Sequence, residues 1–299
     1  MQASHLRHGR LVLPAERNHL VAAVLAVLAV LAVLVVSLMT IVLGTRNRHR
    51  VVPGTGRQAA VDAFWTAEGF TTRAGGLFGA EDADVVSDPT GRFRSVLRVR
   101  YPKGSASPTV TRSDDAPVGG AQRYLLPRGV PADALSLRYY VRFPPNFDFV
   151  KGGKLPGLYG GTVNNGWRIP DGTDGFSTRY MWRAGGAGEV YAYLPTSERH
   201  GTSLGRGDWY FSPRRWHELQ QEVVLNDVGQ RNGRITVWFD GTRVLDEQRV
   251  YFRSTPTLRI DGLMFSTFFG GDNPKWATPV DTFVDFAGFT VSPPPVPGG

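Results

Sequence analysis

The chain has 299 residues, 41% of them hydrophobic, which is enough for one sizeable β domain and excludes an intrinsically disordered protein. Its net charge of +8 would suit a nucleic-acid binder, but six arginines and one glutamate lie in the first fifty residues. The remainder carries 28 cations against 25 anions, so we expect no nucleic-acid partner. Because cysteine is absent, disulfides, thiolate catalysis and iron–sulfur clusters are excluded.

After residue 50 the chain contains two histidines, His200 and His217. Neither lies in a nucleophile motif such as G-x-S-x-G, so the sequence does not indicate a serine hydrolase, and we expect both at the surface or in the core. The sequence PDGTDG at 170–175 offers two aspartates, which is more typical of a turn than of a calcium loop. We expect neither a metal nor another cofactor.

The segment 20–44 contains no charged residue and is about 37 Å long as a helix, enough to cross a bilayer. It is too long for the apolar region of a cleaved signal peptide, so we predict a single transmembrane helix. Three arginines flank it on each side, and the positive-inside rule is nearly tied. We expect 1–19 to be a short cytosolic segment and 45–60 a linker to an extracellular domain.

Between 61 and 292 the sequence has no clear helical periodicity and no internal repeat, and short runs of alternating polar and apolar residues dominate. Asp240-Gly241 between two runs indicates a tight hairpin. We predict an all-β domain, an antiparallel β-sandwich or jelly roll, followed by a Pro/Gly-rich tail at 293–299. The predicted strands lie at 95–101, 135–143, 175–183, 188–194, 216–226, 233–239, 242–250, 260–269 and 282–291.

Two of these strands, GFSTRYMWR and GEVYAYL, are joined by a short Gly-rich segment and predict a hairpin. A hairpin centred near Gly185 pairs Ser177 with Tyr193 and Arg179 with Tyr191. Because side chains alternate along a strand, all four then lie on one face, while a slip of one residue would scatter them. The alternative is an ordinary sheet surface on which arginine and tyrosine make only packing or cation–π contacts.

The segment KGGKLPGLYGG before this hairpin, predicted as a loop, holds two of the four lysines in the chain, Lys151 and Lys154. Thirty arginines supply the other basic side chains. A lysine can change its protonation state near neutral pH when its environment shifts its pKa, whereas an arginine stays charged. The enrichment indicates a functional loop, with a chance placement as the alternative.

These motifs, GGKLPGLYGG, GFSTRYMWR, GEVYAYLP, VWFDG and FSTFFGG, resemble polysaccharide lyase family 14, which includes alginate and glucuronan lyases. The resemblance is clearest between about 152 and 271 and weak before Asp148. It implies cleavage of a uronic-acid polysaccharide by β-elimination. The catalytic residues that it implies are Lys154, Ser177, Arg179, Tyr191 and Tyr193.

Elimination removes the proton at C5 beside a carboxylate, so that carboxylate must be neutralised first. The planar guanidinium of Arg179 suits this task, with Lys154 adding a second positive charge. We expect these cations to lower the pKa of the tyrosines, so that Tyr191 or Tyr193 acts as base, with Tyr191 preferred, and one of the two protonates the leaving oxygen. Ser177 is expected to orient a sugar hydroxyl or the carboxylate. We further predict four substrate-binding residues: Lys151, Trp167, Arg183 and Glu189.

The sequence thus favours a membrane-anchored lyase acting on an acidic polysaccharide outside the cell. A non-catalytic glycan-binding jelly roll would keep the same basic, aromatic groove without turnover. A glycoside hydrolase would need two carboxylates facing each other across the cleft, and only Glu189 falls on the predicted patch.

Overall fold

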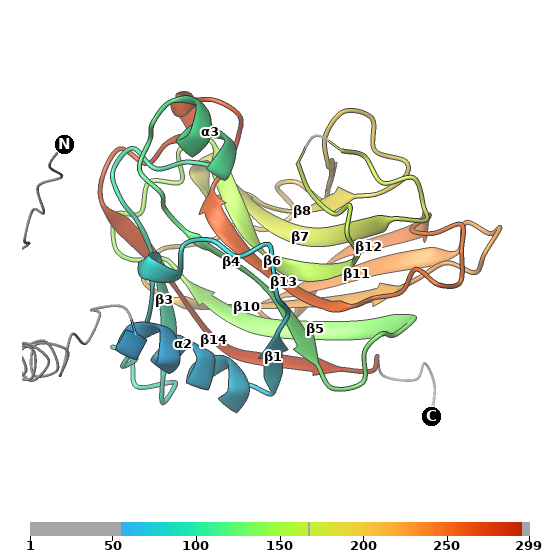
Figure 1. Ribbon diagram of the computed structural model, residues 1–299, viewed down its shortest axis with the longest axis horizontal. Coiled ribbons are helices and arrows are strands. Elements are labelled where there is room, and N and C mark those ends of the chain that lie inside the picture. Colours follow the sequence, from blue (N-terminus) through green and yellow to red (C-terminus); the bar gives the residue numbers. More distant parts are fainter. Residues whose placement is uncertain (1–54, 167, 295–299) are drawn as a thin grey trace, which may run out of the picture. The chain divides into compact units, whose positions relative to one another are not determined.

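The computed structural model describes residues 55–166 and 168–294, which form two antiparallel sheets packed face to face (Figure 1). The first sheet contains in spatial order β1 (Phe70–Thr72), β4 (Ala121–Pro127), β13 (Gly262–Phe269), β6 (Gly152–Gly161), β7 (Gly175–Arg183), β8 (Gly188–Tyr193) and β9 (Thr202–Leu204). The second contains β12 (Thr242–Val250), β11 (Gly233–Phe239), β10 (Trp216–Val224), β5 (Ala134–Arg142), β14 (Thr282–Ser292), β3 (Val96–Tyr101) and β2 (Ala83–Val86).

The expected antiparallel β-sandwich is therefore confirmed, and each of the nine predicted strands is present, with ends shifted by two residues at most. At the predicted tight hairpin, Asp240 and Gly241 have φ angles of 49° and 81°, and the flanking Phe239 and Thr242 pair directly. The remaining elements are short helices: α2 (Thr55–Ala67), η1 (Ala80–Asp82), α3 (Pro108–Ser113), η2 (Ala184–Gly186) and η3 (Pro274–Trp276).

The predicted membrane segment 20–44 lies outside the described residues, as do the cytosolic segment 1–19 and most of the tail. Within 55–166 and 168–294, no helix combines the length and the apolar character needed to cross a bilayer.

Alternation along β7 determines how the site forms. Phe176, Tyr180 and Trp182 are fully buried and belong to the core cluster between the two sheets. The intervening Arg179 points to the opposite face of the first sheet, away from the second. The aromatic core thus fixes the face on which the polar side chains of the hairpin lie.

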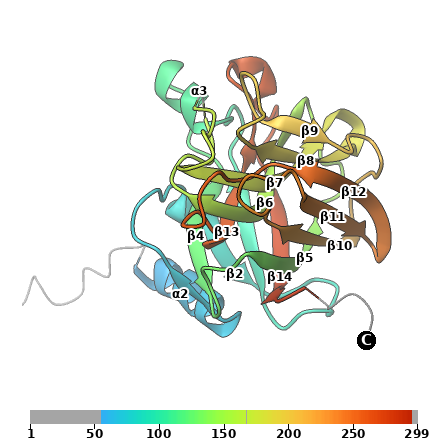
Figure 2. The ribbon, with the colours of Figure 1, turned by 90° about the vertical axis from the view of Figure 1, so that its right-hand side faces the viewer.

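Helix α2 occupies a stretch that the sequence divides between linker and domain without indicating a helix. Its buried residues Val61, Phe64 and Trp65 follow the i, i+3, i+4 spacing of one helical face, and Trp65 packs edge-on against Phe265 of β13. The helix contacts β1 of the first sheet and β2 of the second, so it covers one edge of the sandwich (Figures 1 and 2). With three buried positions, the helix leaves too short an apolar pattern in the sequence to be recognised as helical periodicity.

The lysine-containing segment 151–161 is not a loop, because 152–161 forms the central strand β6. Its glycines lie where neighbouring residues leave no room for a side chain. A Cβ atom at Gly153 would lie 2.0 Å from the ring of Trp182, and one at Gly157 would lie 2.5 Å from Cα of Arg179. The many glycines of this segment, which suggested a loop, are there because neighbouring residues in the sheet pack closely against them.

Candidate active site

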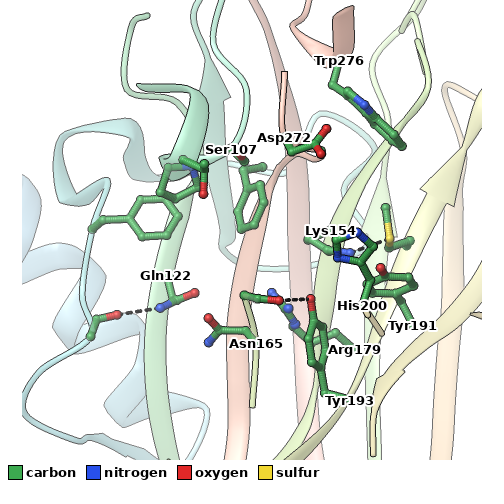
Figure 3. A pocket seen from close by; sticks show the side chains of 18 of the residues that line it. Ser107, Gln122, Lys154, Asn165, Arg179, Tyr191, Tyr193, His200, Asp272 and Trp276 are labelled. Atoms are coloured by element: carbon green, nitrogen blue, oxygen red, sulfur yellow. Dashed lines mark hydrogen bonds between the residues drawn. The ribbon is translucent and has the colours of Figure 1, made fainter. Parts of the chain in front are cut away.

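A cleft of about 710 Å³ lies on the face of the first sheet that points away from the core. Side chains of β6, β7 and β8 form its floor, and its walls come from residues 76–78, α3, the loop at 165–166 and the η3 region. Figure 3 shows Ser107, the N-cap residue of α3, on the opposite side of the cleft from Tyr191 and His200. This size is within the range of pockets that bind small ligands and sugar units.

The predicted hairpin register is confirmed. In the β7–β8 pairing Ser177 lies opposite Tyr193, and Arg179 lies opposite Tyr191. Arg179 and both tyrosines line the cleft, where the two phenol rings meet edge-on with their centroids 5.8 Å apart. The guanidinium of Arg179 lies 5.9 Å from the centre of the Tyr193 ring. The structure therefore brings the cation and the two phenols together, as Figure 3 shows.

Arg179 is a buried cation with no ionic partner among the described residues. Its residue exposure is 1%, and its single hydrogen bond runs from Nη1 to the hydroxyl of Ser266 on β13, at 3.1 Å. Its Nε–H has no acceptor in the described structure. The side chain crosses β6 at Gly157, which lies opposite Arg179 and has no side chain to block it. Burial lowers the pKa of the guanidinium, and an incoming anion would supply the missing countercharge.

Lys154 extends from β6 into the same cleft, opposite Met181 of β7. Its ammonium nitrogen lies 3.4 Å from the centre of the Tyr191 ring and donates to Sδ of Met181 at 2.7 Å. Burial, aided by repulsion from Arg179 and Arg183, holds the pKa of Lys154 well below its usual value. Burial thus disfavours the charged form of Lys154, in contrast to the second positive charge expected from the sequence.

The phenols also differ from the expectation that neighbouring cations would lower their pKa values. Burial raises the pKa of Tyr191 to about 12, and the nearby Tyr193 adds to the effect, while Arg183 and Arg179 only partly oppose it. Burial likewise raises the pKa of Tyr193, against the opposing charge of Arg179. Desolvation of the phenolate outweighs the attraction of the cations, so both tyrosines are protonated at neutral pH.

Ser177 is fully buried and does not line the cleft. Its hydroxyl donates to the carbonyl of Asn164 at 2.6 Å, and the hydroxyl of Tyr193 donates to the carbonyl of Gly166 at 2.9 Å. These two hydrogen bonds fasten the loop that carries Asn165 along the cleft. The geometry gives Ser177 a place beneath the wall of the site, and its predicted contact with the sugar stays a prediction.

The four predicted substrate-binding residues lie in different places. Arg183 lines the cleft but is paired with the fully buried Glu189, with Nε of the arginine 2.8 Å from the carboxylate. Lys151 is exposed at the start of β6 and is not part of the cleft lining. Trp167 lies outside the described residues. Glu189 therefore forms an ion pair with Arg183 on the cleft floor. The substrate contacts of all four residues stay predictions.

Several cleft residues were not singled out from the sequence as parts of the site, among them Gln122, Asn165 and Met181. Gln122 lies directly opposite Ser266 in the β4–β13 pairing, a neighbour that can be found only once the strand order is known. His200 is exposed at the cleft wall beside Tyr191 (Figure 3). His217 is buried outside the cleft, where it stacks on Phe239.

Comparison with known proteins places these features in a family. A crystal structure of the alginate lyase from Aplysia kurodai has 33% sequence identity and a TM-score of 0.64, covering 74% of this chain and 90% of that one. The alginate lyase vAL-1 from Chlorella virus shares the fold, with 23% identity, a TM-score of 0.65 and coverage of 77% and 96%. Exolysin from Paramecium bursaria Chlorella virus 1 is 28% identical over 211 residues, 59% of this chain, which spans about a third (32%) of that protein.

The polysaccharide lyase 14 family model matches residues 90–289, more than half of the chain. The match includes β6, β7 and β8, which carry Lys154, Arg179 and both cleft tyrosines. It agrees with the resemblance noted in the motifs of these strands. The chain therefore belongs to the polysaccharide lyase 14 family.

Proposed function

We propose that this protein cleaves an acidic, uronic-acid polysaccharide of the alginate type by β-elimination. The observation that carries the proposal is Arg179, a buried guanidinium in the cleft with no carboxylate partner among the described residues. An uncompensated buried charge is costly unless an anionic ligand completes it. A uronate carboxylate has the charge and the planar shape that a guanidinium binds.

Neutralising this carboxylate makes the proton at C5 of the sugar acidic enough to remove. As the C5–H bond breaks, its electron pair delocalises toward the carboxylate and forms an enolate-like intermediate. Arg179 stabilises the charge that develops there, in a site shielded from water, where such interactions are stronger. The electron pair then forms the C4–C5 double bond as the C4–O bond to the neighbouring sugar breaks.

The lowered pKa of Lys154 and the raised pKa of Tyr191 favour the lysine as base and the tyrosine as acid, in place of the tyrosine base expected from the sequence. The free amine of Lys154 accepts the C5 proton, and the phenol of Tyr191 gives its proton to the leaving oxygen. After product release, the lysine gives its proton to solvent and the phenolate takes one up from solvent. One catalytic cycle then leaves both groups as they started.

Alginate is the proposed substrate, ahead of glucuronan. The 33% identical structure from Aplysia kurodai is an alginate lyase and aligns with 74% of this chain. The basic residues of the cleft, Arg179 and Arg183 among them, suit a polymer that carries a carboxylate on each sugar.

We also propose that the segment 20–44 anchors the enzyme in a membrane with the lyase domain outside the cell. Its support is the uncharged run of twenty-five residues. An acidic polysaccharide of this kind is an extracellular polymer, so the domain must face outward to reach it. Protease protection of the full chain in intact cells measures this orientation, and protection of the lyase domain would contradict it.

The function is tested by incubating the full-length chain with alginate, polyglucuronate and a neutral glucan. Elimination creates a C4–C5 double bond conjugated with the carboxylate, and its ultraviolet absorbance reports each cleavage. We expect absorbance to grow with alginate and not with the neutral glucan. Binding to uronans with no new absorbance on any of them would instead identify a glycan-binding protein without turnover.

The pH dependence of kcat/KM distinguishes the two possible bases. With Lys154 as base, activity rises as the amine loses its proton, at a pH well below the usual lysine pKa, and then levels off. It falls only as pH approaches about 12, where Tyr191 loses its proton. A rate that climbs steadily from neutral pH toward 12 would mean that the Tyr191 phenolate is the base.

A further inference from the structure

One nitrogen of the Arg179 guanidinium is already bound within the protein, and its Nε–H is buried without a partner among the described residues. Nη1 donates to the hydroxyl of Ser266 at 3.1 Å, whereas Nε–H has no acceptor within the described structure. In an arginine, Nε–H and one N–H of Nη2 point in the same direction and form a planar fork. The Ser266 contact uses Nη1 and therefore leaves this fork without an internal carboxylate partner among the described residues.

The Ser266 hydroxyl is itself held in place by a chain of hydrogen bonds that crosses the first sheet. Ser266 donates to Oε1 of Gln122 at 2.9 Å, and Nε2 of Gln122 donates to the carbonyl of Gly76 at 2.8 Å. Each hydroxyl or amide proton has one acceptor, so the direction of every bond in the chain is fixed. Ser266 is fully buried, and its oxygen must accept from Arg179 because its own proton is used by Gln122.

Two other arginines of this protein show how the Nε and Nη2 nitrogens bind a carboxylate. In the second sheet, Nε and Nη2 of Arg98 donate to the two carboxylate oxygens of Asp285 at 2.8 and 3.0 Å. Arg259 holds Asp133 with the same two nitrogens, at 3.1 and 3.2 Å. Arg179 lines the cleft and, unlike these two arginines, has no carboxylate partner among the described residues.

We propose that Ser266 and Gln122 are positioning residues that hold Nη1 of Arg179, so that the guanidinium is fixed in the orientation in which it receives the substrate carboxylate in the cleft. This inference rests on the proposed lyase function. The guanidinium reaches Ser266 across Gly157, at the end of a long side chain that would otherwise rotate among several conformers. Fixing one edge before substrate arrives removes that freedom and sets the plane in which the carboxylate binds.

Gly76, the final acceptor in this series of hydrogen bonds, lies outside the segment that matches the family. The family match starts at residue 90, whereas Gly76 belongs to the turn that precedes η1 and forms one wall of the cleft. The N-terminal part of the domain thus supports the carboxylate site through Gln122. Any truncation that removes this turn also removes the acceptor of the Gln122 amide.

The test is a double-mutant cycle on binding, measured by calorimetry with an alginate oligosaccharide. The full-length chain carries Tyr191→Phe throughout, so that substrate is not consumed. Ser266→Ala is introduced with Arg179 present and again with Arg179→Lys. Ser105→Ala is the matched control, because the Ser105 hydroxyl is buried, has no hydrogen-bond partner and does not line the cleft.

With Arg179 present, Ser266→Ala is expected to weaken binding about tenfold or more, the effect of losing a hydrogen bond to a charged group. With Arg179→Lys the same change should cost less than about twofold, because the hydroxyl acts through the guanidinium. Gln122→Met, which keeps the side-chain length, should show the same dependence on Arg179. If Ser266→Ala lowers the melting temperature too far for binding to be measured, Gln122→Met tests the positioning role in its place.

Equal losses in the two backgrounds, or no loss with Arg179 present, would overturn the positioning role. That result differs from a failure of the proposed function. If the Tyr191→Phe protein with Ser266 and Arg179 intact binds no uronan, then the lyase proposal fails first and the positioning role falls with it.

Discussion

Replacing Tyr191 by phenylalanine is expected to abolish turnover while leaving substrate binding largely intact. The change removes only the hydroxyl that gives its proton to the leaving oxygen. The ring stays in place between Lys154, 3.4 Å from its centre, and Tyr193. Loss of a general acid typically lowers kcat by about a hundredfold to ten thousandfold. The measurement is kcat from the growth of product absorbance, together with binding by calorimetry.

Tyr210→Phe is the matched control, because Tyr210 is 58% exposed and lies outside the cleft lining. Its activity should equal that of the unmodified chain. Wild-type kcat in Tyr191→Phe would remove Tyr191 from the catalytic assignment. Weakened binding with unchanged kcat would give it a role in substrate affinity alone.

Replacing Arg179 by lysine is the second change with a large expected effect, although it keeps the positive charge. A lysine has no planar fork and cannot bind both carboxylate oxygens side by side. Its shorter reach also loses the hydrogen bond to Ser266. We expect kcat/KM to fall by roughly a hundredfold or more, because the charge that develops on the carboxylate is no longer matched.

Arg128→Lys serves as the comparison, since Arg128 is exposed and lies outside the cleft lining. It should leave kcat/KM unchanged. If Arg179→Lys also kept its activity, a simple positive charge would suffice, and recognition of the carboxylate by the planar guanidinium would be ruled out.

The strands and the β7–β8 hairpin were predictable because both depend on local patterns. Alternation along 175–183 and 188–194 fixes which side chains share a face, and the short Gly-rich turn fixes the register. Arg179 and the two tyrosines could therefore be placed together before any coordinates were known. The face was also set locally, since Phe176 and Trp182 had to point into the core.

Contacts between strands distant in sequence could not be predicted in this way. Gln122 and Ser266 are adjacent only because β4 and β13 pair, and no local pattern specifies that order. Strand β6 was hidden by glycines that serve close packing. The protonation states of Lys154 and Tyr191 were also inaccessible, because they depend on burial, which outweighs the nearby charges visible in the sequence.

The unpaired guanidinium of Arg179 has a consequence for the resting protein as a whole. A buried charge without a counterion destabilises the fold, so Arg179→Met is expected to melt at a higher temperature than the parent while being inactive. For the same reason, a uronate that completes the ion pair should raise the melting temperature of the unmodified chain. Heat resistance alone, followed across a panel of polysaccharides, would then rank candidate substrates even in the inactive Tyr191→Phe variant.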